Sequence, residues 1–180
     1  MPAPLPSCPR VVTFDLSLTS TGFALHDGTT GIMAPGTKRT GPERLDWIRG
    51  RILDTLTRGG YTSQDLVAME DFAYARPQGA TSAGGLGWLI RWTLWAQSIP
   101  YVLIPPTSVK KYATGKGNAK KAQVVSAVTR LTGREFSTDD EPDAWTLWAM
   151  TCHAYGWPKV PETDYRAEAL DAISWPELNR

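Results

Sequence analysis

Residues 11–35 read VVTFDLSLTSTGFALHDGTTGIMAP, and this stretch determines how the fold begins. The β-branched run at 11–16 has the length and composition of a buried strand, and a polar turn follows it. The segments at 21–28 and 29–35 predict two more strands, joined at an Asp-Gly turn that favours a tight hairpin. The stretch therefore predicts a meander of three antiparallel strands.

The rest of the chain alternates between helical and strand patterns. Apolar residues at helical spacing predict a helix over 42–58. Short apolar runs predict strands at 65–72 and 99–106. Further helices are expected at 86–97, after a flexible glycine-rich lead-in, and at 107–113, 119–131, 142–155 and within 165–173. This order predicts an α/β fold with one mixed five-stranded sheet, three antiparallel strands followed by parallel strands, and helices on both faces.

Length and composition favour a single soluble globular domain of 180 residues. No apolar run approaches the roughly 20 residues needed to span a membrane, so no membrane partner is expected. Only Cys8 and Cys152 are present, without metal-ligand spacing, so a reducing cytoplasm is the expected location. We expect a flexible N-terminal arm at 1–10, one catalytic domain at 11–157 and a C-terminal extension at 158–180.

The charges are distributed very unevenly, although the net charge is only +1. Residues 72–134 contain nine Lys or Arg and no Asp or Glu. The segment after them, 135–180, contains three basic and ten acidic residues. A long stretch without any acid is typical of a surface that binds a polyanion, such as nucleic acid.

Four acidic residues lie where predicted strands end or a predicted helix begins. Asp15 and Glu70 each close an apolar run, and Asp140 and Asp143 lie three apart at the start of the helix over 142–155. Taken singly, each acid could be a turn former or a helix N-cap, although strands disfavour acids such as Glu70. Taken together, four carboxylates could hold two Mg²⁺ ions about 4 Å apart over a phosphate. The arrangement therefore predicts a metal-dependent nuclease.

The motifs around these acids resemble those of RuvC-type Holliday junction resolvases, which belong to the ribonuclease H-like superfamily. The stretch DLSLTSTGFAL (15–25) is similar to the family's D-x-G-L-x-x-T-G, and VAMEDFAY (67–74) places the second acid at the end of the fourth strand. GKGNAKKAQV (115–124) resembles G-x-G-x-A-x-K-x-Q-V, and DEPDAW (140–145) resembles D-x-x-D-A. The four motifs occur in the family's order and cover about residues 11–155.

The resemblance implies a ribonuclease H-like nuclease domain at 11–157 that cuts four-way DNA junctions, as a homodimer of bacterial or phage origin. It implies two Mg²⁺ ions per active site, replaceable by Mn²⁺, and products with 5′-phosphate and 3′-hydroxyl ends. The implied catalytic residues are Asp15, Glu70, Asp140, Asp143 and Lys121, with the four acids as metal ligands and Lys121 near the scissile phosphate. The chain departs from the family pattern at Ser17, where glycine is usual, and at Pro142. Asp139 adjoins Asp140, which leaves either one as the ligand, although the spacing to Asp143 favours Asp140.

A second set of residues is expected to contact DNA. Five lysines fall close together in the acid-free segment, and the ordinary alternative is a solvated helix face. Phe72 and Tyr74 could stack on bases opened at a junction, or be ordinary half-buried aromatics. The predicted DNA-binding residues are Lys110, Lys111, Lys116, Lys120, Lys121, Arg76, Phe72 and Tyr74.

Trp88, Trp92 and Trp95 also recur at helical spacing. Core packing is the first interpretation of such a stripe, and a subunit contact, which the resemblance implies for this helix, is the second.

Other functions remain possible at this point. Another branched-DNA nuclease or an RNA–DNA hybrid nuclease of the same fold is the main alternative. An actin-like ATPase or sugar kinase begins with a turn that resembles DLSLTSTG, but needs two such lobes and a second phosphate loop. A junction-binding protein without catalysis would be expected to have lost its acids, and all four are present.

Overall fold

A single five-stranded sheet forms the centre of the computed structural model, which describes residues 9–71 and 80–178. The strands are β1 (Val11–Asp15), β2 (Thr21–Ala24), β3 (Thr30–Met33), β4 (Leu66–Glu70) and β5 (Tyr101–Ile104), in the order β3-β2-β1-β4-β5. Strand β2 pairs antiparallel with β1 and β3, whereas β4 pairs parallel with β1 and β5. The mixed sheet predicted from the sequence is confirmed.

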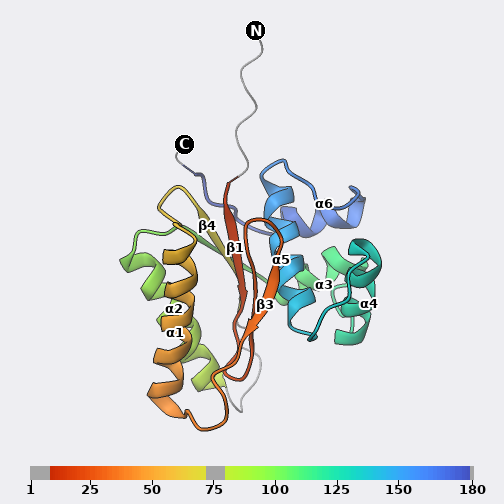
Figure 1. Ribbon diagram of the computed structural model, residues 1–180. Coiled ribbons are helices and arrows are strands. Elements are labelled where there is room, and N and C mark those ends of the chain that lie inside the picture. The colour runs from red at the N-terminus through yellow and green to blue at the C-terminus, as the bar shows by residue number, and fades with distance from the viewer. Residues whose placement is uncertain (1–8, 72–79, 179–180) are drawn as a thin grey trace.

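Helices cover both faces of this sheet, as predicted (Figure 1). One face is covered by α1 (Gly41–Arg58) and α2 (Ala80–Ala96). The other face is covered by α3 (Pro106–Thr114), α4 (Lys121–Thr132) and α5 (Glu141–Ala154), with α6 (Asp164–Asp171) packed against α3. None of the described helices is both long and apolar enough to cross a membrane.

The alternation of side chains along the strands creates a separate hydrophobic core on each face. Val12 and Phe14 of β1 pack with Ile48 and Ile52 of α1. Val11 packs on the opposite face with residues of α3, α4 and α5. The Thr13 hydroxyl, on this same face, donates a hydrogen bond to the Ala144 carbonyl of α5 at 2.7 Å. The same alternation places the next odd-numbered residue, Asp15, on the α5 side of the sheet.

Helix α2 begins at Ala80, six residues before the predicted start at 86. The glycine-rich lead-in, expected to be flexible, is therefore partly helical. A glycine inside a helix costs only about 1 kcal/mol relative to alanine. Burial of Leu86, Ile90 and Leu94 against the sheet outweighs that cost.

The prediction that the tryptophans of α2 pack in the core is wrong. Trp88, Trp92 and Trp95 are 63%, 59% and 71% exposed, and the leucine and isoleucine stripe faces the sheet instead. Both stripes have helical spacing, so periodicity alone could not decide which of them is buried.

The segment predicted as a C-terminal extension contains α6 and packs on the body of the protein. Ala169 and Ile173 are buried in the core beneath α3 and α5. The Arg166 side chain is also buried, and it donates hydrogen bonds to the Tyr112 carbonyl at 3.2 Å and the Pro161 carbonyl at 2.5 Å. The extension therefore fixes the position of α3, the helix that carries Lys110 and Lys111.

Candidate active site

Asp15 and Glu70 lie next to each other because they end two neighbouring parallel strands. The register pairs Phe14 of β1 with Met69 of β4, one residue before each acid. Both side chains are partly buried, and strand alternation directs both toward α5. The two strand-end acids predicted from the sequence are thus brought to one edge of the sheet.

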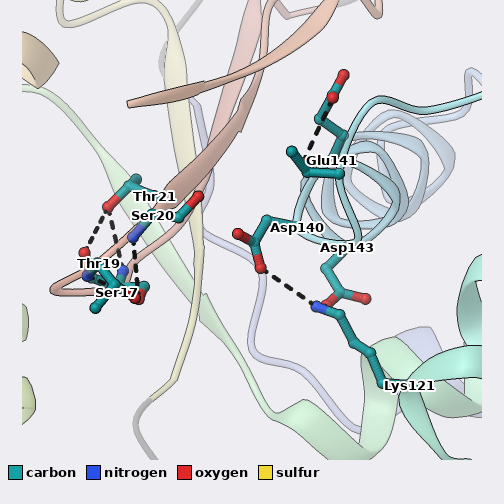
Figure 2. A network of polar contacts seen from close by, with 9 residues as sticks. Ser17, Thr19, Ser20, Thr21, Lys121, Asp140, Glu141 and Asp143 are labelled. Atoms are coloured by element: carbon teal, nitrogen blue, oxygen red, sulfur yellow. Dashed lines mark hydrogen bonds and ion pairs between the residues drawn. The ribbon is translucent and has the colours of Figure 1, made fainter. Parts of the chain in front are cut away.

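Asp140 and Asp143 reach the same place from the start of α5. Asp140 is the N-cap residue of this helix, but its side chain makes no capping hydrogen bond, and Pro142 lies in the first turn. The two carboxylates lie on the same side of the helix start, whereas Glu141 points away from them (Figure 2). Asp139 is exposed and Asp140 is half-buried, which favours Asp140 as the site residue.

Lys121, the first residue of α4, connects to both of these aspartates. Its amine forms an ion pair with the Asp143 carboxylate and lies 3.6 Å from a carboxylate oxygen of Asp140 (Figure 2). The lysine therefore places one positive charge among the acids.

The acids strongly influence one another. Burial raises the pKa of Asp15 well above its usual range, and the charges of Glu70 and Asp143 raise it further. Burial, followed by repulsion from Asp143, raises the pKa of Glu70 to about 7. Burial also raises the pKa of Asp143, against the opposing effect of Lys121. Burial alone would lower the pKa of Lys121, but Asp143 raises it overall. Additional positive charge at this site would favour the ionised form of all three acids.

The donor set matches a hard divalent cation, because it consists of carboxylate oxygens. In the described part of the chain, no three His, Cys, Asp or Glu side chains converge as ligands of a single metal ion. The carboxylates therefore suit a hard divalent cation, while the Lys121 amine provides the local counter-charge to Asp143.

Hydroxyl groups organise the turn that follows Asp15. The Thr21 hydroxyl donates to the Ser17 carbonyl at 3.0 Å and accepts from the Ser17 backbone N–H at 3.1 Å. The Ser17 hydroxyl accepts from the Thr19 backbone N–H at 3.2 Å, inside the same turn (Figure 2). The departure from the family's glycine thus supplies a side chain that closes the turn on itself.

Glu141 holds the start of α5 in place, a role that was not predicted from the sequence. It is buried, and its carboxylate accepts hydrogen bonds from the Thr30 hydroxyl at 2.8 Å and the Ser137 backbone N–H at 3.1 Å. These bonds tie the start of α5, and therefore Asp140, to β3. Its position inside the DEPDAW motif, between Asp140 and Asp143, was the signal for this role in the sequence.

The predicted DNA-binding lysines lie in different surroundings. Lys116 and Lys120 are exposed between α3 and α4, and Lys110 is close enough to Glu70 to lower that group's pKa. Lys111 forms an ion pair of 2.5 Å with Glu168 of α6. Phe72, Tyr74 and Arg76 lie outside the described residues.

Known proteins of one family resemble this chain in sequence. No protein-family model matches the chain. A protein of Nocardia farcinica named crossover junction endodeoxyribonuclease RuvC is 32% identical over 162 residues, which cover 83% of this chain and 82% of the relative. A protein of the same name from Frankia alni is 31% identical, over 84% of this chain and 80% of the relative.

Solved structures show the same fold at lower identity. The Thermus thermophilus RuvC structure superposes with a TM-score of 0.61 at 21% identity, covering 81% of this chain and 93% of that one. T. thermophilus RuvC in complex with a Holliday junction substrate gives a TM-score of 0.62, covering 81% and 92%. Because these relatives match most of the chain at 31–32% identity, the chain is an endonuclease that belongs to the RuvC family of crossover junction endodeoxyribonucleases.

Proposed function

We propose that this protein resolves four-way DNA junctions by metal-dependent hydrolysis of phosphodiester bonds. The observation that carries the proposal is the meeting of Asp15 and Glu70, from two strands, with Asp140 and Asp143, from α5. The names of the curated relatives, and the junction bound to a structural neighbour, support this choice of substrate over other branched DNA.

The four acids would hold two Mg²⁺ ions, with Mn²⁺ as a substitute. When bound, such ions lower the pKa of a water nucleophile and stabilise charge on the attacking and leaving oxygens. The acids' own part is to remain ionised at neutral pH, and positive charge at the site favours this. The products would carry 5′-phosphate and 3′-hydroxyl ends.

Lys121 would stabilise negative charge as it develops on the scissile phosphate. Its amine is already held among the acids by Asp143 and Asp140. A positioned cation of this kind contributes most where charge builds up in the transition state. Lys110, Lys116 and Lys120 would hold flanking phosphates.

The protein would act as a homodimer in the bacterial cytoplasm, with α2 in the subunit interface. The three exposed tryptophans of α2 form an apolar surface, and the Arg91 guanidinium packs 5.2 Å from the centre of the Trp88 ring. Aromatic residues are enriched in protein interfaces. Two sites related by a two-fold axis would suit a junction that needs paired cuts in opposing strands.

The deciding experiment is a Mg²⁺-dependent cleavage assay on five labelled substrates, with Asp15→Asn protein as the control for contaminating nucleases. The substrates are a four-way junction, a fork, a flap, an RNA–DNA hybrid and a linear duplex. We expect paired nicks in the junction at rates well above those for the other four. Preferential cleavage of the hybrid or of flaps would instead support a different nuclease activity on the same fold.

A further inference from the structure

Gly22 occupies a position between two of the proposed metal ligands. It lies in β2 directly opposite Asp15 of β1 in the strand register. A Cβ atom built on Gly22 would lie 2.6 Å from the backbone oxygen of Asp140, 3.0 Å from its carbonyl carbon and 3.3 Å from its Cβ. Gly22 therefore lies beside Asp15 within the sheet, and the place where its side chain would be is next to the Asp140 backbone.

Space, rather than backbone conformation, is what requires glycine here. Gly22 is paired on both sides, with Asp15 in β1 and Ile32 in β3, as an ordinary strand residue. A Cβ atom on Gly22 would collide with the Asp140 backbone, which, unlike a side chain, cannot rotate out of the way. A methyl group could be accommodated only if the start of α5 moved away from β2.

The start of α5 is held against the sheet by further contacts. The buried Thr13 hydroxyl donates to the Ala144 carbonyl at 2.7 Å, one residue beyond Asp143. Glu141 binds the Thr30 hydroxyl of β3 at 2.8 Å. These two bonds hold the helix start against β1 and β3. The contact between Gly22 and the Asp140 backbone sets how closely it can approach β2.

We propose that Gly22, together with Thr13, is a positioning residue that fixes Asp140 and Asp143 relative to Asp15. The proposal rests on the proposed function, in that these aspartates hold the metal ions. Catalytic groups must be held within about 0.5 Å of their productive geometry. A displacement of about 1 Å can cost on the order of 10²-fold in rate. The lack of a side chain at Gly22 therefore allows Asp140 to lie at the position that the metal site requires.

The test compares Gly22→Ala with Gly31→Ala, the same substitution one strand away. A Cβ on Gly31 would meet the Phe23 ring at 2.7 Å, a side chain that packs toward the α1 and α2 core and not toward the acids. We expect Gly22→Ala to lower single-turnover junction cleavage by about 10²-fold and to raise the Mg²⁺ concentration needed for half-maximal rate. Mn²⁺ binding to the DNA-free protein, followed by electron paramagnetic resonance, should weaken in parallel. Junction affinity measured without divalent metal should stay close to that of the wild type, because the exposed Lys116 and Lys120 lie outside the displaced segment.

Thr13→Val provides a second test that adds no atom to the interface. It removes the hydrogen bond to Ala144 while keeping the side-chain volume. We expect a smaller rise in the Mg²⁺ requirement, again with normal junction affinity. If Gly22→Ala does not fold, Thr13→Val decides alone, and a wild-type Mg²⁺ requirement in that variant overturns the proposal.

Normal cleavage and normal Mn²⁺ affinity in folded Gly22→Ala would also overturn the positioning role. Asp140→Asn distinguishes that result from a failure of the proposed function. If Asp140→Asn abolishes cleavage while Gly22→Ala does not, the metal site stands and the positioning role falls. If Asp140→Asn cleaves normally, the assignment of Asp140 as a metal ligand is itself wrong.

Discussion

The Asp15 carboxylate lies close enough to Glu70, Asp140, Asp143 and Lys121 for all four charges to influence its pKa. We expect Asp15→Asn to abolish cleavage in Mg²⁺ while preserving or tightening junction binding. Loss of a metal ligand should remove several kcal/mol of transition-state stabilisation, about 10³-fold in rate. The lost negative charge also reduces repulsion of phosphate. Single-turnover kinetics and gel-shift titrations measure the two effects, and near-normal turnover would contradict the metal assignment.

Glu70 gives a prediction about pH because its pKa is raised to about 7 in the folded protein. In the unfolded chain the group ionises near its ordinary pKa of 4.5. Below pH 4.5 the group is protonated in both states, and above pH 7 the folded protein carries the full cost of the buried charge. In the absence of metal, Glu70→Gln removes this cost, so we expect a higher Tm at pH 8. Each kcal/mol gained in the free energy of unfolding should raise Tm by about 2–4 °C. The gain in Tm should vanish toward pH 4. Thermal melts in EDTA across this range test the sign, and a loss of stability at pH 8 would contradict it.

Lys121 differs from the other lysines because it is paired with Asp140 and Asp143, two of the proposed metal ligands. We expect Lys121→Ala to depress single-turnover cleavage more than junction affinity, since its charge is needed most as the pentacoordinate phosphate forms. Lys120→Ala is the matched control, one residue away and exposed between α3 and α4. Equal proportional losses of affinity and cleavage in both variants would reduce Lys121 to an ordinary phosphate contact.

Some residues of the candidate site could be predicted from the sequence, and others could not. The sequence could single out the four acids as candidates, because each lies where a predicted strand ends or a predicted helix begins, within a motif that resembles the family's. They are Asp15, Glu70, Asp140 and Asp143. The roles of Gly22, Thr13 and Glu141 were not, because each depends on contact between segments far apart in the sequence. Such contacts exist only after α5 has docked on the sheet.

At the scale of elements, strand and helix order was predictable because short apolar runs and apolar residues at helical spacing differ clearly along this chain. Helix α2 was the exception, since two apolar stripes on one helix leave its orientation open. Its buried stripe is aliphatic and packs in the core shared with α1, and the bulkier tryptophans remain on the outside.

The outward stripe of α2 gives a prediction about assembly. We expect the wild-type protein to sediment as a dimer and Trp92→Glu to sediment as a monomer, because a charge in the centre of an apolar interface is costly to bury. Trp157→Glu is the matched control, since Trp157 is also exposed but lies beyond the end of α5. The monomer should retain a normal melting curve. An unchanged sedimentation coefficient in Trp92→Glu would place the subunit contact elsewhere.

At the scale of the whole molecule, the acid-free segment becomes two different structures. Its residues 80–96 form α2, whose outer surface is apolar, and its residues 101–132 include β5, α3 and α4, where the lysines gather. A groove of about 630 Å³ between α3, α4 and α6 adds Lys116 and Arg130 to this basic region. The sequence predicted the positive charge but not the contribution of α6, which brings Glu168 onto Lys111.

This arrangement divides the lysines by how freely their charge can reach DNA. Each phosphate that a lysine neutralises contributes about −0.9 to the slope of log affinity against log salt. Lys116→Ala and Lys120→Ala should each reduce that slope by nearly the full amount, because both side chains are exposed. Lys111→Ala should reduce it less, because the pair with Glu168 must be broken before Lys111 can bind a phosphate.

Removing the competitor should have the opposite effect. Glu168→Gln frees the Lys111 amine, so we expect tighter junction binding at low salt and a slope that is steeper by up to about 0.9. Fluorescence anisotropy with a four-way junction in Ca²⁺, from 50 to 300 mM salt, gives the slope for each variant without cleavage. The double variant Lys111→Ala/Glu168→Gln should return to the slope of Lys111→Ala, because the effect of Glu168 acts through that lysine. A steeper slope that persists in the double variant would mean that Glu168 repels DNA directly, as a charge on the surface of α6, and does not act as a counter-ion to Lys111.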